Sequence, residues 1–399
     1  MSKKPNDVVI TGIGIVSCHG AGREAHESLL NAAEAPQPIT DAQSFAPYPV
    51  HPLPEIDWSE QIARRGDQRQ METWQRLGVY TAGLALDDAG MKDDAELCGS
   101  MDMIVAAGGG ERDISVDSLI VDEAAKRNDR GVLLNEKLTT ELRPTLFLAQ
   151  LSNLLAGNIS IVHKVTGSSK TFMGEEGAGV SAFATAFERI RAGQSTHALI
   201  GGAYNAARPD MHILFEGYQM LAQGDWQPLW SRGSPGGGII TGSASAFLVL
   251  ETRQHAEARD AKIYATIAAV EGDRGARDDG GFEKRFSRLA ERADVADDPG
   301  LLVLSGASGE HEMRDRERVL IDGKWPQAAL RGYSGLTGHS LEAQFAVGMA
   351  LAALALKTAA KPPRFDAERE SDMTVPASSA LVTVTGYVHS EGLAALTSE

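Results

Sequence analysis

The chain has 399 residues, enough for one large domain or two fused domains with well-filled cores. Its formal net charge of −16 argues against a general affinity for DNA or RNA, whose phosphates need a basic surface. A hydrophobic content of 43% is too high for a disordered chain. Only two cysteines are present, Cys18 and Cys98, which is too few for a disulfide framework, so we expect two reduced thiols in a cytoplasmic protein.

No targeting or membrane segment is expected. The N-terminal residues lack the apolar stretch and small-residue cleavage site of a signal peptide. The longest apolar run, Phe345 to Leu356, falls short of the roughly 20 residues that cross a bilayer and has the length of a buried helix. We therefore expect a cytoplasmic chain without a membrane span.

The predicted elements begin with a strand at Val8 to Ile10 that runs into a glycine turn. Residues 35–75 are predicted to be an irregular surface excursion, because prolines and charged residues interrupt any periodicity. A helix is predicted from Trp74 to Ala89. The next strand, Met103 to Ala107, breaks at the glycines 108–110.

Two later stretches share one order of elements: strand, glycine turn, buried helix, strand. The first copy comprises the elements at 103–107, at 177–192 and from Ala198, and the second those at 301–304, at 340–358 and from Ala380. This repetition predicts an internal duplication. The polar stretch at 251–262 follows a strand at 244–250, so we expect an N-terminal half at 1–255 and a C-terminal half at 256–399. Helices that are apolar on every side indicate a layered α/β fold.

The common cofactor and metal signatures are missing. Gly12-x-Gly14 lacks the third glycine of the dinucleotide fingerprint, and Gly323-Lys324 lacks the Ser or Thr of a phosphate loop. No Cys-x-x-Cys or His-Glu-x-x-His pattern occurs. Cys18 and His19 are sequence neighbours that should point apart, which argues against a thiolate pair. We therefore expect no cofactor and no metal.

The most informative segment runs from Met173 to Gly193, where a glycine-flanked turn enters a buried helix. Such an entry places one side chain at the helix N-terminus, where the dipole favours negative charge and would activate a cysteine as its thiolate. Here the position carries Glu175 and Glu176. Two glutamates in a first helical turn are also ordinary helix-start residues, so the segment alone leaves both interpretations open.

With this segment in place, the chain resembles the β-ketoacyl-acyl-carrier-protein synthases, especially the chain-elongating type, over nearly its whole length. The matching stretches are Val8 to Gly20, Trp74 to Gly90, Arg143 to Gly167, Gln227 to Glu251, and the motif from Ser334 to His339. The resemblance implies a duplicated thiolase-like fold with α/β/α/β/α layers. It also implies an acyl carrier protein as partner.

The positions that match the family's active site depart from its pattern. Counting back from the glycines after the helix, the family's nucleophilic cysteine falls on Glu176. The motif of the first histidine has none, and shows Gly306 and Ala307 instead. The lysine that opens the second motif is replaced by Ser334, while His339 is retained. We call these five residues the vestigial site.

The family transfers an acyl group to its cysteine, decarboxylates a malonyl unit and stabilises the enolate with two histidines. A carboxylate cannot accept an acyl chain by thioester exchange, and the loss of one member of such a set usually costs orders of magnitude in rate. The resemblance and its departures together predict a catalytically degenerate, chain-length-factor-like homologue. It would pair with a cysteine-bearing ketosynthase as a heterodimer and set acyl chain length in fatty-acid or polyketide elongation.

Two alternatives stay open. One is an active enzyme, either a 3-oxoacyl-acyl-carrier-protein synthase or a malonyl decarboxylase that uses Glu176 and His339. The other is a homodimeric module that binds an acyl chain or a carrier protein without altering it. Because carrier proteins are acidic, a docking patch must be locally basic, and a solvated or dimer-contacting face is the simpler interpretation of such a patch. The one dense basic stretch of the first half is Arg64, Arg65, Arg69 and Arg76.

Overall fold

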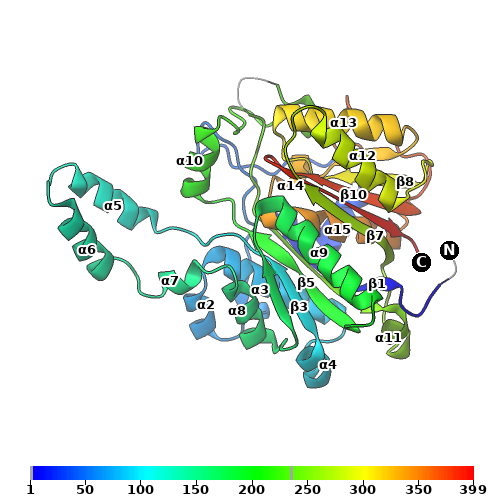
Figure 1. Ribbon diagram of the computed structural model, residues 1–399, viewed down its shortest axis with the longest axis horizontal. Coiled ribbons are helices and arrows are strands. Elements are labelled where there is room, and N and C mark those ends of the chain that lie inside the picture. The colour runs from blue at the N-terminus through cyan, green and yellow to red at the C-terminus, as the bar shows by residue number, and fades with distance from the viewer. Residues whose placement is uncertain (1–2, 234–236) are drawn as a thin grey trace.

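The computed structural model describes residues 3–233 and 237–399, and in this part of the chain eleven strands join into one mixed sheet (Figure 1). The order is β4-β3-β5-β6-β1-β7-β11-β10-β8-β9, with β2 paired to β1. Numbered within each half, both sets of five main strands lie in the order 3-2-4-5-1, counted from opposite edges of the sheet. The predicted duplication is confirmed. The strands are β1 (Val8–Ser17), β2 (Gly20–Ala21), β3 (Asp102–Ala106), β4 (Ser169–Phe172), β5 (His197–Tyr204), β6 (Ala244–Thr252), β7 (Ala265–Arg274), β8 (Leu301–Ser305), β9 (Ala329–Gly332), β10 (Ser379–Thr385) and β11 (Ser390–Thr397).

The two halves meet where the first strand of one pairs with the first strand of the other. Val8, Val9 and Ile10 of β1 lie opposite Ile267, Thr266 and Ala265 of β7 in an antiparallel ladder. Within each half, the inner strands pair in parallel, β3 with β4 and β5, and β8 with β9 and β10. Strands buried on both faces read as continuous apolar runs, which is why the sequence shows them clearly.

Two helices form a middle layer between the halves. α9 (Glu175–Arg191) contacts β5 of the first half and β7 of the second, and α15 (Gln344–Lys357) contacts β6 and β10. Every residue of α15 from Gln344 to Leu356 is buried, because strands of both halves cover it. The sheet therefore folds over at the β1–β7 junction and encloses these helices.

Outer helices cover the other two faces and complete the predicted α/β/α/β/α layers. α3 (Thr73–Asp88) packs on β1, β5 and β6 together with α8 (Leu154–His163), and α12 (Gly281–Ala293) packs on β7 and β11 beside α13 (His311–Lys324). The smaller helices of the body are α1 (Arg23–Leu30), α2 (Arg65–Gln70), α4 (Ala95–Ser100), α10 (Pro209–Gly217), α11 (Arg253–Ala258) and α14 (Ser334–Thr337). Among the described helices, none combines the length and the apolarity that a bilayer crossing requires.

Between β3 and α8 the chain leaves the body as a helical projection, which we call the arm (residues 111–151; left in Figure 1). It comprises α5 (Ile114–Ala124), α6 (Arg130–Thr140) and the short α7 (Leu146–Ala149). Only Val116 of α5 and Leu133 of α6 are buried within these two helices. The arm thus has almost no core of its own.

Three expectations need adjustment. The predicted helix at 340–358 is broken, because Leu341–Ala343 forms a 3-10 turn, with Leu341 at φ 45°, and α15 begins only at Gln344. The excursion at 35–75 is irregular, but it is not only a surface segment, since His51 and Ile62 are fully buried. The boundary between residues 255 and 256 falls inside α11 and stays a prediction.

The Gly-x-Gly of β1 serves helix packing. A Cβ atom on Gly14 would clash with the carbonyl oxygen of Thr81 and lie 2.8 Å from the backbone nitrogen of Ala85, both in α3. A Cβ atom on Gly12 would similarly lie 2.6 Å from the Cβ atom of Ala89. The two glycines let α3 lie directly on β1.

We expect Gly14→Ala to lower the free energy of unfolding by about 1–3 kcal/mol, because the added methyl group pushes α3 off β1. Gly131→Ala in α6 is the matched control, since nothing lies within 4 Å of its Cβ position and alanine favours helix. Urea denaturation measures both variants. Equal stability of the Gly14→Ala variant and the wild type would contradict the close packing.

Candidate active site

A strained turn leads into α9 and decides where its first side chains go. Gly174 has φ 124° and Glu175 φ 56°, so a residue other than glycine occupies the left-handed region at the helix start. After this turn Glu176 points into the protein and is 0% exposed. Glu175 stays half-buried.

The imidazole of His339 faces the Glu176 carboxylate. The Nε2 atom of His339 lies 2.9 Å from Oε1 of Glu176, with both side chains fully buried; the two atoms are close but not aligned as a hydrogen bond. The N–H of His339 donates to the carbonyl of Ile240 at 2.8 Å, and its carbonyl accepts from the N–H of Gly242 at 3.0 Å. The backbone of the segment before β6 therefore holds the histidine in place.

The Glu176 carboxyl is kept ionised although it is buried. Burial alone would raise its pKa, but the adjacent His339 and the backbone N–H groups of Glu176 and Tyr387 outweigh burial and bring the pKa below its ordinary value. The N–H of Tyr387 lies 3.3 Å from Oε1 of Glu176. Within the described residues, Oε2 of Glu176 has no hydrogen-bond partner.

Tyr387, in the loop between β10 and β11, closes over this pair. Its hydroxyl donates to Oε1 of Glu175 at 2.6 Å. Its ring lies edge-on to that of His339, with centroids 6.2 Å apart. A Cβ atom on the preceding Gly386 would lie 2.8 Å from Oε2 of Glu176, so only glycine allows the loop to come this close. The sequence shows this loop's position in the family pattern but not the role of Tyr387 in closing the site.

A third carboxyl group belongs to the same centre and was missed by the sequence reasoning. Glu342 follows His339 by three residues, is 6% exposed, and comes within 2.6 Å of the Cβ position of Gly108. Burial and the nearby charge of Glu176 raise the pKa of Glu342. The same two causes raise the pKa of Glu175, although the hydrogen bond from Tyr387 acts in the opposite direction and lowers it. Three carboxyl groups therefore lie near one another at this centre, and only that of Glu176 has a lowered pKa.

The other three vestigial positions form a second group. Ser334 Oγ donates to the carbonyl of Ala307 at 2.5 Å, and the N–H of Ala307 donates to Ser305 Oγ at 3.2 Å. A Cβ atom on Gly306 would lie 2.8 Å from the Cζ atom of Tyr333, and closer still to its hydroxyl oxygen. The Tyr333 ring, fully buried, fills the space that a side chain at position 306 would need.

Tyr333 also connects the two groups. Its hydroxyl donates to the carbonyl of Gln344 at 2.7 Å, and Gln344 Oε1 accepts from the backbone N–H and the hydroxyl of Ser340, the residue after His339. The structure thus brings Glu176 and His339 into contact and places Gly306, Ala307 and Ser334 in a separate group beside Tyr333.

The chain is not free of cysteine: Cys18 and Cys98 are both present, and both are buried. Cys18 donates to the carbonyl of Leu336 at 3.2 Å, and burial raises the pKa of its thiol to about 12. His19 Nε2 reaches the same carbonyl at 3.2 Å, so the expectation that Cys18 and His19 point apart is wrong. The raised pKa still argues against a thiolate pair. Cys98 donates to the carbonyl of Met91 at 3.2 Å, and burial raises its pKa as well.

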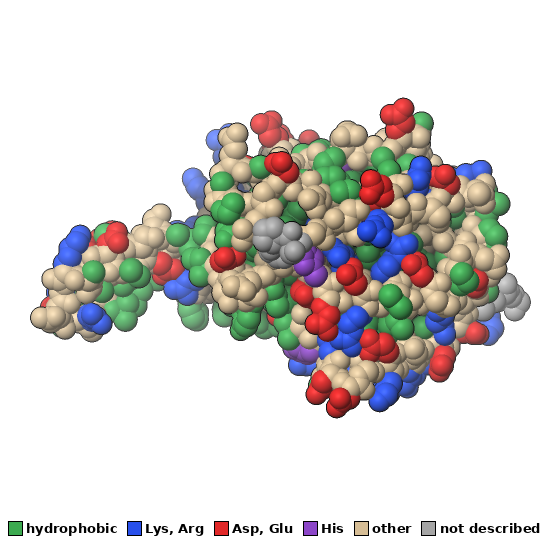
Figure 2. Space-filling model, turned by 90° about the horizontal axis from the view of Figure 1, so that it is seen from above, with side chains coloured by type: hydrophobic (Ala, Val, Ile, Leu, Met, Phe, Trp, Pro, Cys, Tyr) green, Lys and Arg blue, Asp and Glu red, His purple; other side chains and the backbone are tan. Residues whose placement is uncertain are grey.

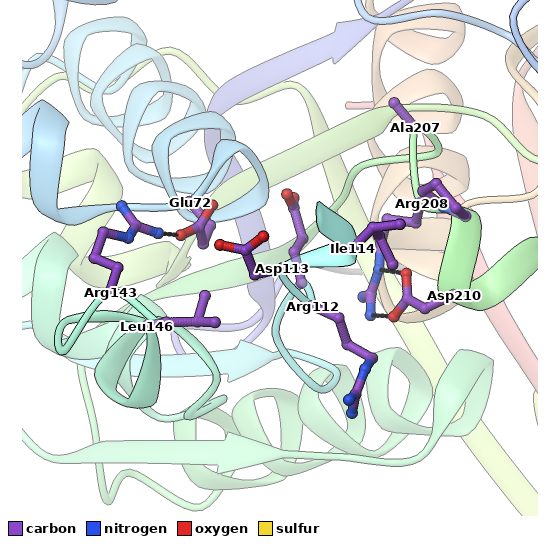
Figure 3. A pocket seen from close by; sticks show the side chains of 11 residues that line it. Glu72, Arg112, Asp113, Ile114, Arg143, Leu146, Ala207, Arg208 and Asp210 are labelled. Carbon is purple, nitrogen blue, oxygen red and sulfur yellow. Dashed lines mark hydrogen bonds and ion pairs between the residues drawn. The ribbon is translucent and has the colours of Figure 1, made fainter. Parts of the chain in front are cut away.

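A cavity of about 250 Å³ lies not at the vestigial site but at the root of the arm (Figure 3). Residues from both ends of the arm line it, together with Glu72 before α3 and the first residues of α10. Arg143 pairs with Glu72, and Arg208 pairs with Asp210 at 2.6 Å. Since the guanidinium of Arg208 also donates to the carbonyls of residues 109 and 110, the cavity wall ties the arm root to α10.

The two helix-start glutamates should respond oppositely to loss of charge. The pKa of Glu176 is lower in the folded state than in the unfolded state, where it is near 4.3. The ionised carboxylate therefore contributes to stability at pH values above the unfolded-state pKa, and this contribution is lost as pH falls through the folded-state pKa. We expect Glu176→Gln to cost about 1–3 kcal/mol of unfolding free energy at pH 7, with the cost shrinking below about pH 4.

For Glu175 the folded-state pKa is raised, so its stabilisation is complete below the unfolded value and is lost as pH rises through the folded-state pKa. Glu175→Gln keeps an acceptor for Tyr387 and is expected to leave stability at pH 7 unchanged or higher. Denaturant titrations from about pH 3 to 8 measure both variants. A Glu176→Gln variant as stable as the wild type at pH 7 would contradict the buried pair.

The comparisons with known proteins agree with this geometry. Residues 5–256 match the family described as Beta-ketoacyl synthase, N-terminal domain. The chain is 25% identical over 383 residues to 3-oxoacyl-[acyl-carrier-protein] synthase 2 of Vibrio harveyi, covering 91% of this chain and 88% of that protein. It is 27% identical over 372 residues to the tetracenomycin polyketide synthase ketoacyl synthase beta subunit of Streptomyces glaucescens, covering 90% and 88%.

Among solved structures, the ishigamide ketosynthase/chain length factor superposes with a TM-score of 0.78 at 20% identity, covering 99% of this chain and 100% of that one. This likeness shows the fold, and the match at 5–256, well over half of the chain, shows the family. The strand order, the buried entry into α9 and these matches lead to one conclusion: this chain belongs to the β-ketoacyl synthase family.

Proposed function

We propose that this chain is a catalytically degenerate ketosynthase subunit that pairs with a cysteine-bearing ketosynthase and sets the length of the acyl chain in fatty-acid or polyketide elongation. The observation that carries the proposal is the buried Glu176–His339 contact at the start of α9, where the family's nucleophile is expected. A carboxylate there cannot form the acyl thioester on which condensation depends.

The surroundings of the pair support the same proposal over an active enzyme. Enolate stabilisation in the family needs two histidines, and Tyr333 fills the space beside Gly306, where the first is expected. The ionised carboxylate of Glu176 opposes a developing enolate rather than stabilising it. A synthase or decarboxylase that uses Glu176 and His339 would have to open this closed centre first.

The carboxyl groups of Glu175, Glu176 and Glu342 argue against a module that stores an acyl chain at this site. Ionised or buried carboxyl groups are poor neighbours for hydrocarbon, because each apolar contact would replace solvation or hydrogen bonding that the carboxyl group needs. Tyr387 further closes the site by its bond to Glu175. The centre is better suited to hold two halves of the fold together than to admit a substrate.

The surface supports a partner chain. β4 lies at the edge of the sheet, with Ser169 and Lys170 exposed, and an unpaired edge is a template for pairing with another strand. Hydrophobic side chains gather along the arm (Figure 2). The large ones exposed on it are Val121, Val132, Leu134, Leu138, Phe147, Leu148 and Leu151. An apolar surface of this kind on a projection without a core marks an interaction site.

Names among the similar proteins favour the same role. One relative is a ketoacyl synthase beta subunit, and one structural neighbour is a ketosynthase/chain length factor. The acyl carrier protein in the name of the Vibrio relative supports a carrier protein as a further partner. The exposed Arg64, Arg65 and Arg69 at α2 offer it a basic face, whereas Arg76 stacks over Trp58 at 5.6 Å and is half-buried.

Affinity purification of the tagged chain from its native host tests the proposal. We expect a cysteine-bearing ketosynthase at one-to-one stoichiometry, identified by mass spectrometry, and a changed acyl length in the product when this chain is removed. A chain that purifies only as a homodimer and turns over malonyl-carrier protein by itself would sink the proposal and favour the enzyme alternative.

Restoring the nucleophile alone should not restore condensation. We expect Glu176→Cys to give no condensation above background with acyl and malonyl carrier proteins, because the histidine expected at Gly306 is absent and Tyr333 occupies its place. Alkylation by iodoacetamide in the denatured protein, followed by mass spectrometry, verifies the new thiol, with Glu176→Ser as the matched control. Condensation by the Glu176→Cys variant at a rate near that of an active ketosynthase would contradict this account.

A further inference from the structure

A buried guanidinium without a carboxylate partner lies beside the loop that follows β8. Arg232 is 5% exposed, and it donates from Nε to the carbonyl of Gln227 at 3.0 Å and from Nη1 to that of Gly238 at 2.8 Å. Within the described residues, Nη2 of Arg232 has no hydrogen-bond partner and no carboxylate forms an ion pair with this side chain. Residues 234–236, outside the described part of the chain, are Ser, Pro and Gly and bring no acid.

The surroundings of Arg232 add positive charge instead of balancing it. Arg314 of α13 is 6% exposed, and its Nη1 donates to the carbonyl of Arg232 at 2.8 Å. The carboxylate of Asp315 is engaged by Nε of Arg314 at 2.8 Å. Burial and the charge of Arg314 lower the pKa of Arg232 to about 9, so the guanidinium is still protonated at pH 7. A buried charge of this kind is costly unless a counter-charge lies beside it.

His311, the first residue of α13, brings a second nitrogen atom without a partner. Its Nε2 is buried and unpaired in the described part of the chain. Two glycines at positive φ, Gly238 and Gly309, bring it near Arg232. A Cβ atom on Gly238 would lie 2.8 Å from Nε2 of His311, and one on Gly309 would lie 2.8 Å from Nη1 of Arg232 and 2.5 Å from the carbonyl oxygen of Gly238. Arg232 and His311 therefore flank one close contact between two glycines.

The other titratable side chains near this contact do not supply a counter-charge. Glu310 caps α13, and its carboxylate accepts from the N–H of Glu312 at 3.2 Å and of Met313 at 2.9 Å. His51 is 0% exposed, and its Nδ1 lies 2.8 Å from the carbonyl of Ile39, which places the proton on Nδ1. Burial and the charge of Arg232 lower the pKa of His51 to about 3, so this imidazole is neutral at pH 7.

The cluster also joins the two halves of the fold close to the vestigial site. Arg232 and Gly238 belong to the segment before β6, whereas Gly309 and His311 follow β8. The same segment before β6 holds His339, because the carbonyl of Ile240 accepts the N–H of His339 at 2.8 Å. A group bound between Arg232 and His311 would therefore tie together the two backbone segments that frame the vestigial residues.

We propose that Arg232 and His311 bind a small inorganic anion of the size of chloride or phosphate, which supplies the missing counter-charge and links the segment before β6 to the loop after β8. The anion accepts hydrogen bonds from Nη2 of Arg232 and Nε2 of His311, the two atoms that lack partners. The start of α13 adds the positive end of a helix dipole. The inference goes beyond the proposed function and does not depend on a partner chain.

Urea denaturation at fixed ionic strength and pH 7 tests the site, with chloride or phosphate replacing gluconate, whose carboxylate is carried on a long polyol. We expect a saturable rise of the urea midpoint with at least one of the two anions, because only the folded chain offers the site. Phosphate also stabilises proteins in general, so the variants identify the site. Arg232→Gln should abolish the saturable rise. Arg191→Gln, which removes the same charge from an exposed ion pair with Glu188, is the matched control and should keep it.

His311→Ala should weaken the apparent affinity for the anion about threefold to tenfold, because it removes one of two hydrogen-bond donors. It also assigns the imidazole signal of His311 for a second readout by NMR. Burial and the charges of Arg314 and Arg232 lower the pKa of His311, so a bound anion should raise that pKa relative to its value in gluconate.

Equal urea midpoints of the wild type in all three anions would mean that a neutral group such as water completes Nη2 of Arg232, and would overturn the inference. A saturable rise that survives in Arg232→Gln would place the anion elsewhere and overturn it as well. If Arg232→Gln does not fold, the half-buried position 311 decides, and an unchanged anion affinity in His311→Ala refutes the site.

Discussion

The contact between Glu176 and His339 is the constraint around which the centre of this molecule is built. The glutamate comes from the first half, at the entry to α9, and the histidine from the second, just before α15. A buried carboxylate is costly unless it is paired, and removing one partner of such a pair leaves an uncompensated charge in the core. The strained turn at Glu175 directs Glu176 into the core, and the missing side chain of Gly386 leaves room for its carboxyl group.

This pairing also decides what the centre cannot do. A helix N-terminus suits an anion, and in the family it serves a thiolate; here it serves a carboxylate that already has its counter-group. Glu175 and Glu342 add carboxyl groups whose raised pKa reflects burial beside Glu176, and buried carboxyl groups are poor neighbours for a hydrocarbon chain. Tyr333 fills the space beside Gly306, and the hydroxyl of Tyr387 donates to Glu175.

The features that call for a partner lie instead on the surface, and two aromatic rings link one of them, α10, to the centre. Phe215 under α10 touches Tyr387, and Tyr387 holds Glu175. The edge strand β4, the exposed Ile213 and Leu214 of α10 and the projecting arm are the features that support the proposed association with a partner chain.

Much of this could be read from the sequence, and for definite reasons. Continuous apolar strands, the apolar α15 and the repeated order of elements depend on local pattern, so both the duplication and the layers were predicted.

Glu176 and His339 were singled out as positions in family motifs, but their contact joins residues far apart in the chain. The contact of Tyr387 with Glu176 spans 211 positions, and no local pattern signals it. Glu342, the filling of the space beside Gly306 by Tyr333, and the convergence of Cys18 and His19 on Leu336 were missed for the same reason. The sequence by itself determined which elements form, and it predicted which active-site residues are replaced, because both depend on short stretches of chain. Only the tertiary structure decided which side chains share a buried space, because burial sets the charge of each carboxyl group and depends on every element packed around it.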